Sequence, residues 1–173
     1  MSAVETLASE ICDAARDIKL NLPAVLAPGS LTPEQRWGVA IASAVASRNV
    51  RLQVAVIADA RNEVSQSVVD DAVAAAAIMA MNNVFYSFRH MIGQPSYGDY
   101  RAGLRMNRLA KPAGNKVDFE LYAMAASAIG GCEWCICSHE RVVVEAGLTE
   151  QQVHDAIRIA AVIHGAAIAL EVA

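Results

Sequence analysis

The sequence predicts an all-α fold, and three of its features support that prediction. Apolar residues recur every three or four positions along most of the chain, the spacing that gives a helix one apolar face. No stretch shows the alternation of apolar and polar residues that is typical of a half-buried strand. Hydrophobic residues make up 55% of the 173 residues and aromatic residues only 5%. Most of the apolar content is therefore small and aliphatic, which suits helices that pack closely.

The first helix is expected between Val4 and Leu20, where apolar residues at helical spacing cover about four turns. Pro23 and the Pro28–Gly29 pair are expected to break the chain after it, because proline and glycine both disfavour a continuing helix.

A second helix is expected from Thr32 to about Ser47. Thr32 can cap it, Pro33 suits its first turn, and Gln35 can complete a capping box. The stretch between residues 95 and 115 is rich in turn residues and is expected to be a loop with at most one short helix. The other helices are expected between similar start and stop signals, at residues 50–62, 65 or 67 to about 91, 116–129, 132–147 and 149 to close to 173.

An internal repeat is indicated by two blocks of residues that match at a common offset of 84. Residues 42–44 match residues 126–128, and five residues within 69–77 match residues within 153–161. The abundance of alanine inflates such matches, so the repeat is a hypothesis that only the arrangement of helices can test.

The repeat predicts a single domain over residues 1–173, with two pseudo-symmetric halves at about 30–92 and 115–173. In this register two arginines of the first half, Arg48 and Arg51, correspond to two cysteines of the second half, Cys132 and Cys135. Only the second half would then have thiol chemistry.

The composition excludes some classes of partner. A net charge of -4 gives no reason to expect nucleic acid or an anionic membrane as a partner. Residues 1–21 contain acids and no apolar core of a signal peptide. The longest apolar run, Ala72 to Met81, is shorter than the roughly 20 residues of a membrane-spanning helix. We therefore expect a soluble, cytoplasmic protein with no nucleic-acid or membrane partner, in which any disulfide is catalytic or sensing.

The densest cluster of reactive side chains lies between residues 118 and 141. It contains Glu120, Cys132, Cys135 and His139. A C-x-x-C pair in a chain with no sign of export indicates redox or metal chemistry rather than a structural disulfide.

The spacing of these four residues predicts one site. The glycine pair before Cys132 allows a sharp turn between two helices, so Cys132 lies at the cap of the second helix and Cys135 one turn in, where the helix end stabilises a thiolate. His139 shares a face with Cys135 because they are four residues apart, and an antiparallel hairpin brings Glu120 nearly level with His139. In such an arrangement the carboxylate orients the imidazole, and the imidazole relays a proton to or from the thiol. This is how a cysteine nucleophile is activated. The second thiol can resolve a sulfenic acid or a mixed disulfide.

A metal site is the main alternative at this cluster. Four ligands are available, from Cys132, Cys135, Cys137 and His139. Ordinary zinc sites draw two pairs of ligands from separate segments, and a continuous helix points Cys137 away from the face of Cys135. We therefore expect no bound metal, and we expect Cys137, like Cys12, to be a small buried hydrophobic residue.

The remaining histidines and large apolar residues are expected to be structural. Trp134 either covers the thiols or packs against a neighbouring helix. No acid or thiol pattern surrounds the other candidates, which are interpreted as core or surface residues: His90, His154, His164, Trp37, Met79 and Met81.

The combined pattern of Glu120, Cys132, Cys135 and His139 resembles the alkyl hydroperoxide reductase D family, within the carboxymuconolactone decarboxylase-like superfamily. The resemblance covers nearly the whole chain. It extends to four segments that look like those of actinobacterial members, at residues 17–22, 81–86, 103–107 and 115–120.

This resemblance implies an all-α fold of two pseudo-repeats, commonly assembled as a homotrimer, with no bound cofactor. It implies an antioxidant peroxidase that reduces organic hydroperoxides and regenerates the peroxiredoxin alkyl hydroperoxide reductase C. The electrons would come from dihydrolipoamide on an acyltransferase, which dihydrolipoamide dehydrogenase recharges from NADH. The family pattern assigns the sulfenic acid to Cys135, the proton-donor and resolving role to Cys132, and the proton relay to His139 and Glu120.

One residue departs from the family pattern, because Trp134 lies where mycobacterial members have a histidine. Any contribution of that imidazole to thiol acidity is missing. Helix geometry makes the cap thiol, Cys132, the more exposed and more acidic one, whereas the resemblance favours Cys135. We therefore expect Cys135 to react with peroxide and Cys132 to form the mixed disulfide with a lipoyl or peroxiredoxin partner.

Two other functions stay open on the sequence. One is a decarboxylase-like lyase of the same superfamily, which would not need the C-x-x-C pair. The other is a redox-sensing or metal-binding module without turnover. Because the chain has no glycine-rich dinucleotide motif, it is not expected to oxidise NADH by itself.

Overall fold

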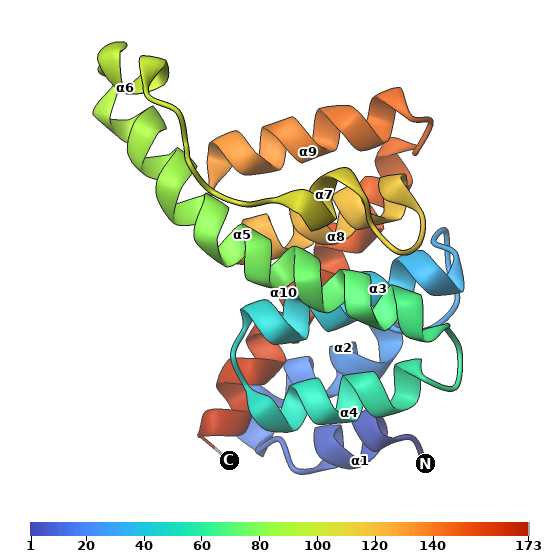
Figure 1. The fold of residues 1–173 in the computed structure, drawn as a ribbon. Helices are drawn as coiled ribbons and strands as arrows, with labels where there is room; N and C mark the ends of the chain where they lie inside the picture. Colours follow the sequence, from blue (N-terminus) through green and yellow to red (C-terminus); the bar gives the residue numbers. More distant parts are fainter. Residues whose placement is uncertain (173) are drawn as a thin grey trace.

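Helices form all the regular structure of residues 1–172, the part of the chain that the computed structural model describes (Figure 1). The prediction of an all-α fold is confirmed. The α-helices are α1 (Ala3–Ser9), α2 (Arg16–Val25), α3 (Pro33–Ala46), α4 (Val50–Ala60), α5 (Gln66–Ile92), α6 (Ser96–Asp99), α7 (Asn107–Ala110), α8 (Lys116–Ile129), α9 (Glu133–Glu145) and α10 (Glu150–Glu171), and a 3₁₀ turn spans Asp13–Ala15.

The core is built around α3 and α8, which contact each other and both contact α5 and α10. The two helices cross closely because Gly38 has no side chain: a Cβ there would lie 2.1 Å from Cζ of Tyr122. The Tyr122 hydroxyl donates to the backbone oxygen of Glu34 at 2.9 Å, and burial raises the pKa of this phenol.

Next to this contact the Gln35 amide donates to Asp118 at 3.0 Å, and burial raises the pKa of that carboxyl. Small residues therefore let the central helices approach each other, and polar side chains tie their ends together.

Cap residues set several helix boundaries as the sequence predicts. Thr32 and Gln35 form a capping box at the start of α3, and Thr149 and Gln152 form another at the start of α10. The bounds of α8 agree with the prediction. The αL conformation of Gly93, with φ 62°, ends α5.

The prediction of one helix over residues 4–20 is wrong, because the chain breaks after α1 and resumes as α2. The reason is packing: α1 contacts α4, whereas α2 contacts α10, and one straight helix cannot lie along both. The ammonium group of Lys19 donates to the backbone oxygens of Ser9 and Ile11, at 3.0 and 3.3 Å, and so stabilises the break. Ile11 is buried within it.

Pro23 does not end the helix, as the sequence suggested, but lies inside α2. Because it falls in the last turn, only one intrahelical hydrogen bond is lost. The buried side chains of Leu22 and Leu26 hold this turn against the core.

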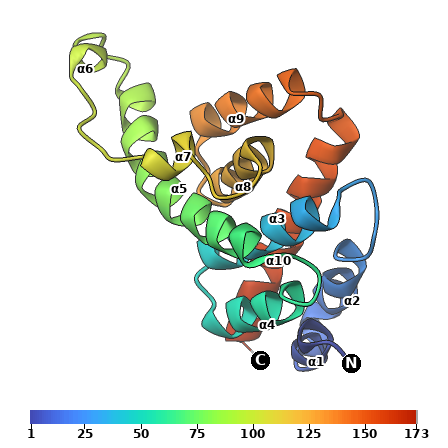
Figure 2. The same ribbon diagram turned by 45° about the vertical axis from the view of Figure 1, so that its right-hand side comes forward.

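The stretch between α5 and α8 contains two four-residue helices, α6 and α7, where at most one was expected. The carboxyl-terminal part of α5 and α6 project from the bundle, and the chain then returns along α5 to α7 (Figures 1 and 2). Asp71 on α5 fixes the returning segment. Its carboxylate accepts from the backbone N–H groups of Ala113 and Gly114, at 3.0 and 2.7 Å, and from Arg108 at 2.7 Å.

By length and composition alone, α5 and α10 are apolar enough to cross a membrane, although the longest unbroken apolar run, Ala72 to Met81, is shorter than a span. About half of the most apolar window of each helix, 50% and 44%, is buried inside the bundle. Core helices of soluble proteins have the same property, so these two helices are weak evidence for a membrane span.

The order and lengths of α3–α5 parallel those of α8–α10. The predicted offset of 84 residues between the two halves is, however, off by one residue at the α3–α4 and α8–α9 turns. Asn49 caps α4 as Cys132 caps α9, and Arg48 has the positive φ of Gly131, 62° against 68°. Arg48 therefore corresponds to Gly131 and not to Cys132. That the two halves, about 30–92 and 115–173, are repeats of one unit stays a prediction, and their last residue, Ala173, lies outside the described residues.

Candidate active site

The turn between α8 and α9 positions the two cysteines. Gly131 takes a φ of 68°, which suits glycine, although a Cβ added there would meet nothing within 4 Å. Gly130 is required for a different reason, since a Cβ there would lie 2.2 Å from the amide nitrogen of Asn83. The chain then enters α9 with Cys132 as its cap, and Sγ of Cys132 accepts from the backbone N–H of Cys135 at 3.2 Å. The cap position predicted for Cys132 is confirmed.

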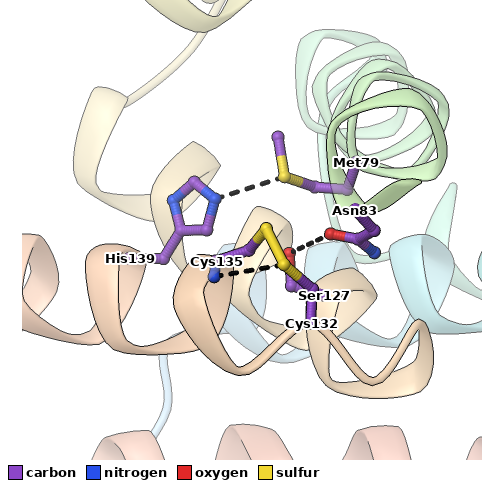
Figure 3. Close-up of a disulfide and its surroundings, with 6 residues drawn as sticks. All are labelled: Met79, Asn83, Ser127, Cys132, Cys135 and His139. Carbon is purple, nitrogen blue, oxygen red and sulfur yellow. Dashed lines mark hydrogen bonds between the residues drawn. A yellow bond between two sulfur atoms is a disulfide. The ribbon is translucent and has the colours of Figure 1, made fainter. Parts of the chain in front are cut away.

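A disulfide joins Cys132 and Cys135, so the structure shows the oxidised form of the pair (Figure 3). Cys132 is 0% exposed and Cys135 is 5% exposed. The expectation that the cap thiol is the more exposed one is therefore wrong for this form. The turn folds Cys132 inward beneath α5, which helix geometry alone does not reveal.

His139 and Glu120 form a buried pair across the hairpin of α8 and α9. Nδ1 of His139 donates to Oε2 of Glu120 at 2.6 Å, and each residue is 8% exposed. The antiparallel hairpin brings the two level, as their distances from the glycine turn predict. The four predicted site residues, Glu120, Cys132, Cys135 and His139, thus lie in one buried cluster.

Met79 is a member of this cluster that the sequence reading assigned only to the core. Its Sδ lies 3.2 Å from Nε2 of His139, and its side chain reaches from α5 over the imidazole and the disulfide (Figure 3). A thioether sulfur offers only lone pairs, so Met79 can act only as the acceptor in this contact. No local signal distinguishes Met79 from an ordinary core methionine, because the contact joins helices 60 residues apart in the chain.

One turn further along α5, Asn83 supports the glycine turn. Its Oδ1 accepts from the hydroxyl of Ser127 at 3.1 Å, and both residues are buried (Figure 3). The pair ties α5 to the end of α8, directly before the cysteines. Neither residue was singled out from the sequence.

The two ring nitrogens of His139 have different partners. The Glu120 carboxylate lies at Nδ1 and the Met79 thioether at Nε2. These two contacts, from α8 and α5, fix the orientation of the imidazole one turn from Cys135. The ring is therefore held where it can exchange a proton with a group at Cys135.

Other candidates from the sequence lie elsewhere. Cys137 is exposed and Cys12 is half-buried, so the prediction that both are buried is wrong for Cys137. Cys137 points away from Cys135, as its position on α9 requires. Trp134 is 56% exposed and stacks on His90, with ring centroids 5.8 Å apart.

The other two histidines, His154 and His164, are exposed. Within residues 1–172, no three side chains of His, Cys, Asp or Glu are arranged to hold a metal ion.

An open groove of about 930 Å³ runs past the glycine turn. Gly131 and Glu133, the residues on either side of Cys132, line one end of it. The groove continues along α5 to the connection between α3 and α4 and to α10. Its walls are mostly alkyl groups, so it offers an apolar approach to the turn that holds the disulfide.

Comparison with known proteins finds similar sequences over the whole chain. The sequence profile of the Carboxymuconolactone decarboxylase family matches residues 95–173. The chain is 63% identical to Alkyl hydroperoxide reductase AhpD of Anaeromyxobacter dehalogenans (strain 2CP-C) over 173 residues, which are 100% of this chain and 93% of that protein.

Two further proteins of the same name are similar over 171 residues, 99% of this chain. The one from Anaeromyxobacter sp. (strain Fw109-5) is 58% identical with 92% of its length covered, and the one from Brucella suis (strain ATCC 23445 / NCTC 10510) is 44% identical with 98% covered. None of these three relatives is actinobacterial, so the expectation of an actinobacterial type is not supported.

Proposed function

The chain belongs to the AhpD family of alkyl hydroperoxide reductases, which are peroxidase-type oxidoreductases, and we propose that it reduces organic hydroperoxides with Cys132 and Cys135 as its redox pair. The observation that supports this most is the buried cluster in which a Glu120–His139 pair adjoins the Cys132–Cys135 disulfide. The chemistry comes from side chains alone, with no bound cofactor or metal.

The oxidative half of the reaction begins with reduced Cys135. Its thiolate attacks one oxygen of the hydroperoxide, the O–O bond breaks, and the alkoxide leaves with a proton as the alcohol. Cys135 is then a sulfenic acid. The Cys132 thiol attacks that sulfur, the S–O bond breaks, and water leaves as the disulfide forms. One hydroperoxide and two thiols thus yield one alcohol, one water and one disulfide.

His139 and Glu120 move and balance the proton in this scheme. His139 takes the proton of the Cys135 thiol and returns it to the departing oxygen, while the Glu120 carboxylate orients the ring and stabilises its charged form. The sharing of one helix face by Cys135 and His139 supports Cys135, rather than Cys132, as the residue that reacts with peroxide.

The reductive half needs an external dithiol. We assign that role to a dihydrolipoyl group on an acyltransferase, recharged by dihydrolipoamide dehydrogenase and NADH, as the family pattern implies. The first thiolate attacks Cys132, whose two neighbours line the groove, and Cys135 leaves as a thiolate beside His139 (Figure 3). The second thiol of the carrier then completes the exchange, so the carrier becomes a disulfide and the protein a dithiol. The same exchange would regenerate the peroxiredoxin alkyl hydroperoxide reductase C.

The assembly belongs to the proposal as well. We infer one domain over residues 1–173 that assembles as a cytoplasmic homotrimer. The inference of an oligomer is supported by three exposed apolar side chains at the projecting end of α5 and around α6: Ile92, Tyr97 and Tyr100. Apolar patches of this kind mark contacts between proteins. Sedimentation equilibrium should give three times the 18.3 kDa of one chain, and a monomer at micromolar concentration would contradict it.

A thiol titration tests the redox function. The chain has four cysteines, and Cys12 and Cys137 are outside the disulfide. Reduced protein should therefore lose two titratable thiols per chain, from four to two, when an equivalent of alkyl hydroperoxide is added, and should form one equivalent of alcohol. Peptide mapping should place the new disulfide between Cys132 and Cys135. Oxidation that stops after one equivalent of alcohol even when a reducing dithiol is supplied would indicate a redox sensor instead, and decarboxylation without thiol loss would indicate a lyase.

A coupled assay tests the electron source. The chain alone should not consume NADH in the presence of hydroperoxide, whereas adding dihydrolipoamide dehydrogenase and a lipoyl carrier should start consumption. NADH oxidation by the protein alone would contradict the assigned reductant.

A further inference from the structure

The groove beside the redox turn has two chemically different ends. One end is formed by the turn that includes Gly131 and Glu133, next to Cys132. The other is formed by Ser47 and Arg48 of the α3–α4 connection and by His164 of α10, which lie on the same side of the bundle. Between them the lining is mostly apolar, with Asn83, Ser87 and His90 as its polar members, and includes Val45, Ala76, Ala80, Val84, Phe88 and Ile129. A volume of about 930 Å³ is within the range of small-molecule sites.

Arg48 is the unusual residue of this groove. It has a φ of 62°, the only positive φ among the non-glycine residues that the structure describes. This position follows the end of α3, where glycine is favoured, and the corresponding residue after α8 is Gly131. An arginine here costs backbone strain that a glycine would avoid.

No interaction of the Arg48 side chain within the chain offsets this strain. It is exposed and makes no hydrogen bond or ion pair with any of residues 1–172. Nearby, Nδ1 of His164 and the hydroxyl of Ser47 lie 3.1 Å apart and present further polar atoms at the same end. The strained residue therefore presents a free guanidinium at the rim of an apolar groove, where a carboxylate is its best-matched partner.

Charge also sets the direction of a ligand. Glu133 lies at the redox end and would repel a carboxylate, whereas Arg48 at the opposite end would attract one. We propose that the groove binds hydroperoxides of long-chain carboxylic acids, with the carboxylate at Arg48, the alkyl chain along α5 and the hydroperoxide group toward the Cys132–Cys135 turn. This inference rests on the proposed peroxidase function, and the reaction is the one given above with the acid as the alkyl group. It makes Arg48 a specificity-determining residue.

Matched substrates test the inference. The hydroperoxide of a long-chain fatty acid and its methyl ester differ only in the charge that Arg48 would recognise. Arg48→Gly should lower kcat/KM for the free acid about tenfold, the size expected for a partly exposed charge-assisted hydrogen bond, and leave the ester within about twofold. Arg48→Lys should retain most of the preference. Arg61→Ala, which removes an exposed arginine outside the groove, should change neither substrate.

Stability separates recognition from a structural role. Because glycine prefers a positive φ, Arg48→Gly should melt at the same or a higher temperature than the unaltered protein. A saturated fatty acid should inhibit the unaltered protein competitively, and about tenfold more weakly after Arg48→Gly. An equal fall for acid and ester, or no fall for either, would overturn the proposal.

The oligomer provides another decisive outcome. If Arg48→Gly dissociates the assembly and both substrates suffer equally, the groove is a contact between copies of the chain and the proposal is wrong. If the unaltered protein reduces a small neutral hydroperoxide but shows no preference for the acid over the ester, only this inference fails. If it reduces none of the three, the proposed peroxidase function fails instead.

Discussion

The two sets of three helices, α3–α5 and α8–α10, build the same turn and use it differently. In the first set, Oδ1 of Asn49 accepts from the backbone N–H of Leu52 at 2.9 Å. In the second, Sγ of Cys132 accepts from the backbone N–H of Cys135 at 3.2 Å. Both side chains cap the helix that follows. The cysteine adds a reactive sulfur at a position that the fold already requires to accept a hydrogen bond.

The other two site residues also replace structural residues of the first set. In the register set by these two caps, Val56 of α4 corresponds to His139, and Trp37 of α3 corresponds to Glu120. Val56 is 0% exposed and Trp37 is also buried, so the first set fills these positions with apolar side chains. The comparison indicates that the helical frame does not depend on the redox residues. Four side chains, with Met79 from α5 above them, distinguish a site from an ordinary part of the core.

The two sets also hold each other by a reciprocal contact. Asp71 of α5 binds the loop before α8 at Gly114, and Asp155 of α10 binds the loop before α3, where it accepts from the hydroxyl of Ser30 at 2.6 Å. These loops and carboxylates correspond at the offset of 84 that the sequence suggested. The difference is burial, because the side chain of Asp71 is 2% exposed and that of Asp155 is 19% exposed.

The largest effect on turnover should come from replacing either redox cysteine by serine, which at position 132 can still cap the helix but cannot form a disulfide. Cys132→Ser and Cys135→Ser should each abolish catalytic turnover, since neither can complete the disulfide. Asn49→Ser makes the matching change at the cap of α4 and should leave turnover near normal. Cys137→Ser should do the same. The measurement is steady-state reduction of an alkyl hydroperoxide with a dithiol. Full turnover by Cys132→Ser would show that the pair does not act as a disulfide.

The next effect should come from the Glu120–His139 pair, which the first set lacks. Glu120→Gln and His139→Gln should each slow peroxide reduction by roughly 10²–10⁴-fold, the usual size of a general acid–base contribution. The double variant should be little slower than the worse single one, because residues that act as a unit are not additive.

Two controls accompany the relay prediction. His164→Gln changes an exposed histidine and should not affect the reduction of a small neutral hydroperoxide. The pH–rate profile should lose one limb in His139→Gln and keep both in His164→Gln. Multiplicative losses in the Glu120/His139 double variant would mean that the two residues act separately.

The reciprocal carboxylates should differ in their contribution to stability. Asp71→Ala removes a buried carboxylate that accepts from two backbone N–H groups and the Arg108 guanidinium at partly buried contacts, and should lower the free energy of unfolding by about 3 kcal/mol. Asp155→Ala, at the more exposed copy, should lower it by less than about 1 kcal/mol. Urea denaturation measures both. Equal losses would mean that burial does not decide the difference.

The contribution of Asp155, the more exposed of the two carboxylates, to stability should also depend on pH. The hydrogen bond from Ser30 is the main cause that lowers the pKa of Asp155 from 3.8 to about 2. A carboxyl whose pKa is lower in the folded state stabilises the fold above its unfolded pKa and loses that contribution as the pH falls through its folded pKa. The difference in stability between the unaltered protein and Asp155→Asn should therefore disappear between about pH 4 and pH 2. A difference that persists below pH 2 would exclude this carboxylate as its source.

The smallest effect should come from Met79. Met79→Leu keeps the volume but removes the acceptor at Nε2 of His139, and should slow the reductive step about threefold to tenfold, because a sulfur acceptor is weak. Stability should change little, since leucine replaces methionine well in a core. The ¹⁵N chemical shifts of the His139 ring should change in the oxidised form, which a purely structural role would not cause. Unchanged shifts and rates would reduce Met79 to a packing residue.

Local signals in the sequence determined much of this protein. The capping boxes at Thr32 and Thr149, and the glycine pair at the α8–α9 turn, set helix boundaries because each acts within one turn of backbone. The spacing of Cys132, Cys135 and His139 placed them together for the same reason, since residues three and four apart share a helix face.

Only the tertiary structure decided which helices meet, because helical periodicity identifies an apolar face but not its partner. It broke the first predicted helix so that α1 and α2 could lie along different neighbours. It brought Met79 to His139 across 60 residues, buried Cys132 at a cap where exposure was expected, and left Cys137 in solvent. It also placed the strained Arg48 and the redox turn at opposite ends of one groove, since a groove is made by the packing of several helices and has no signature in any single segment.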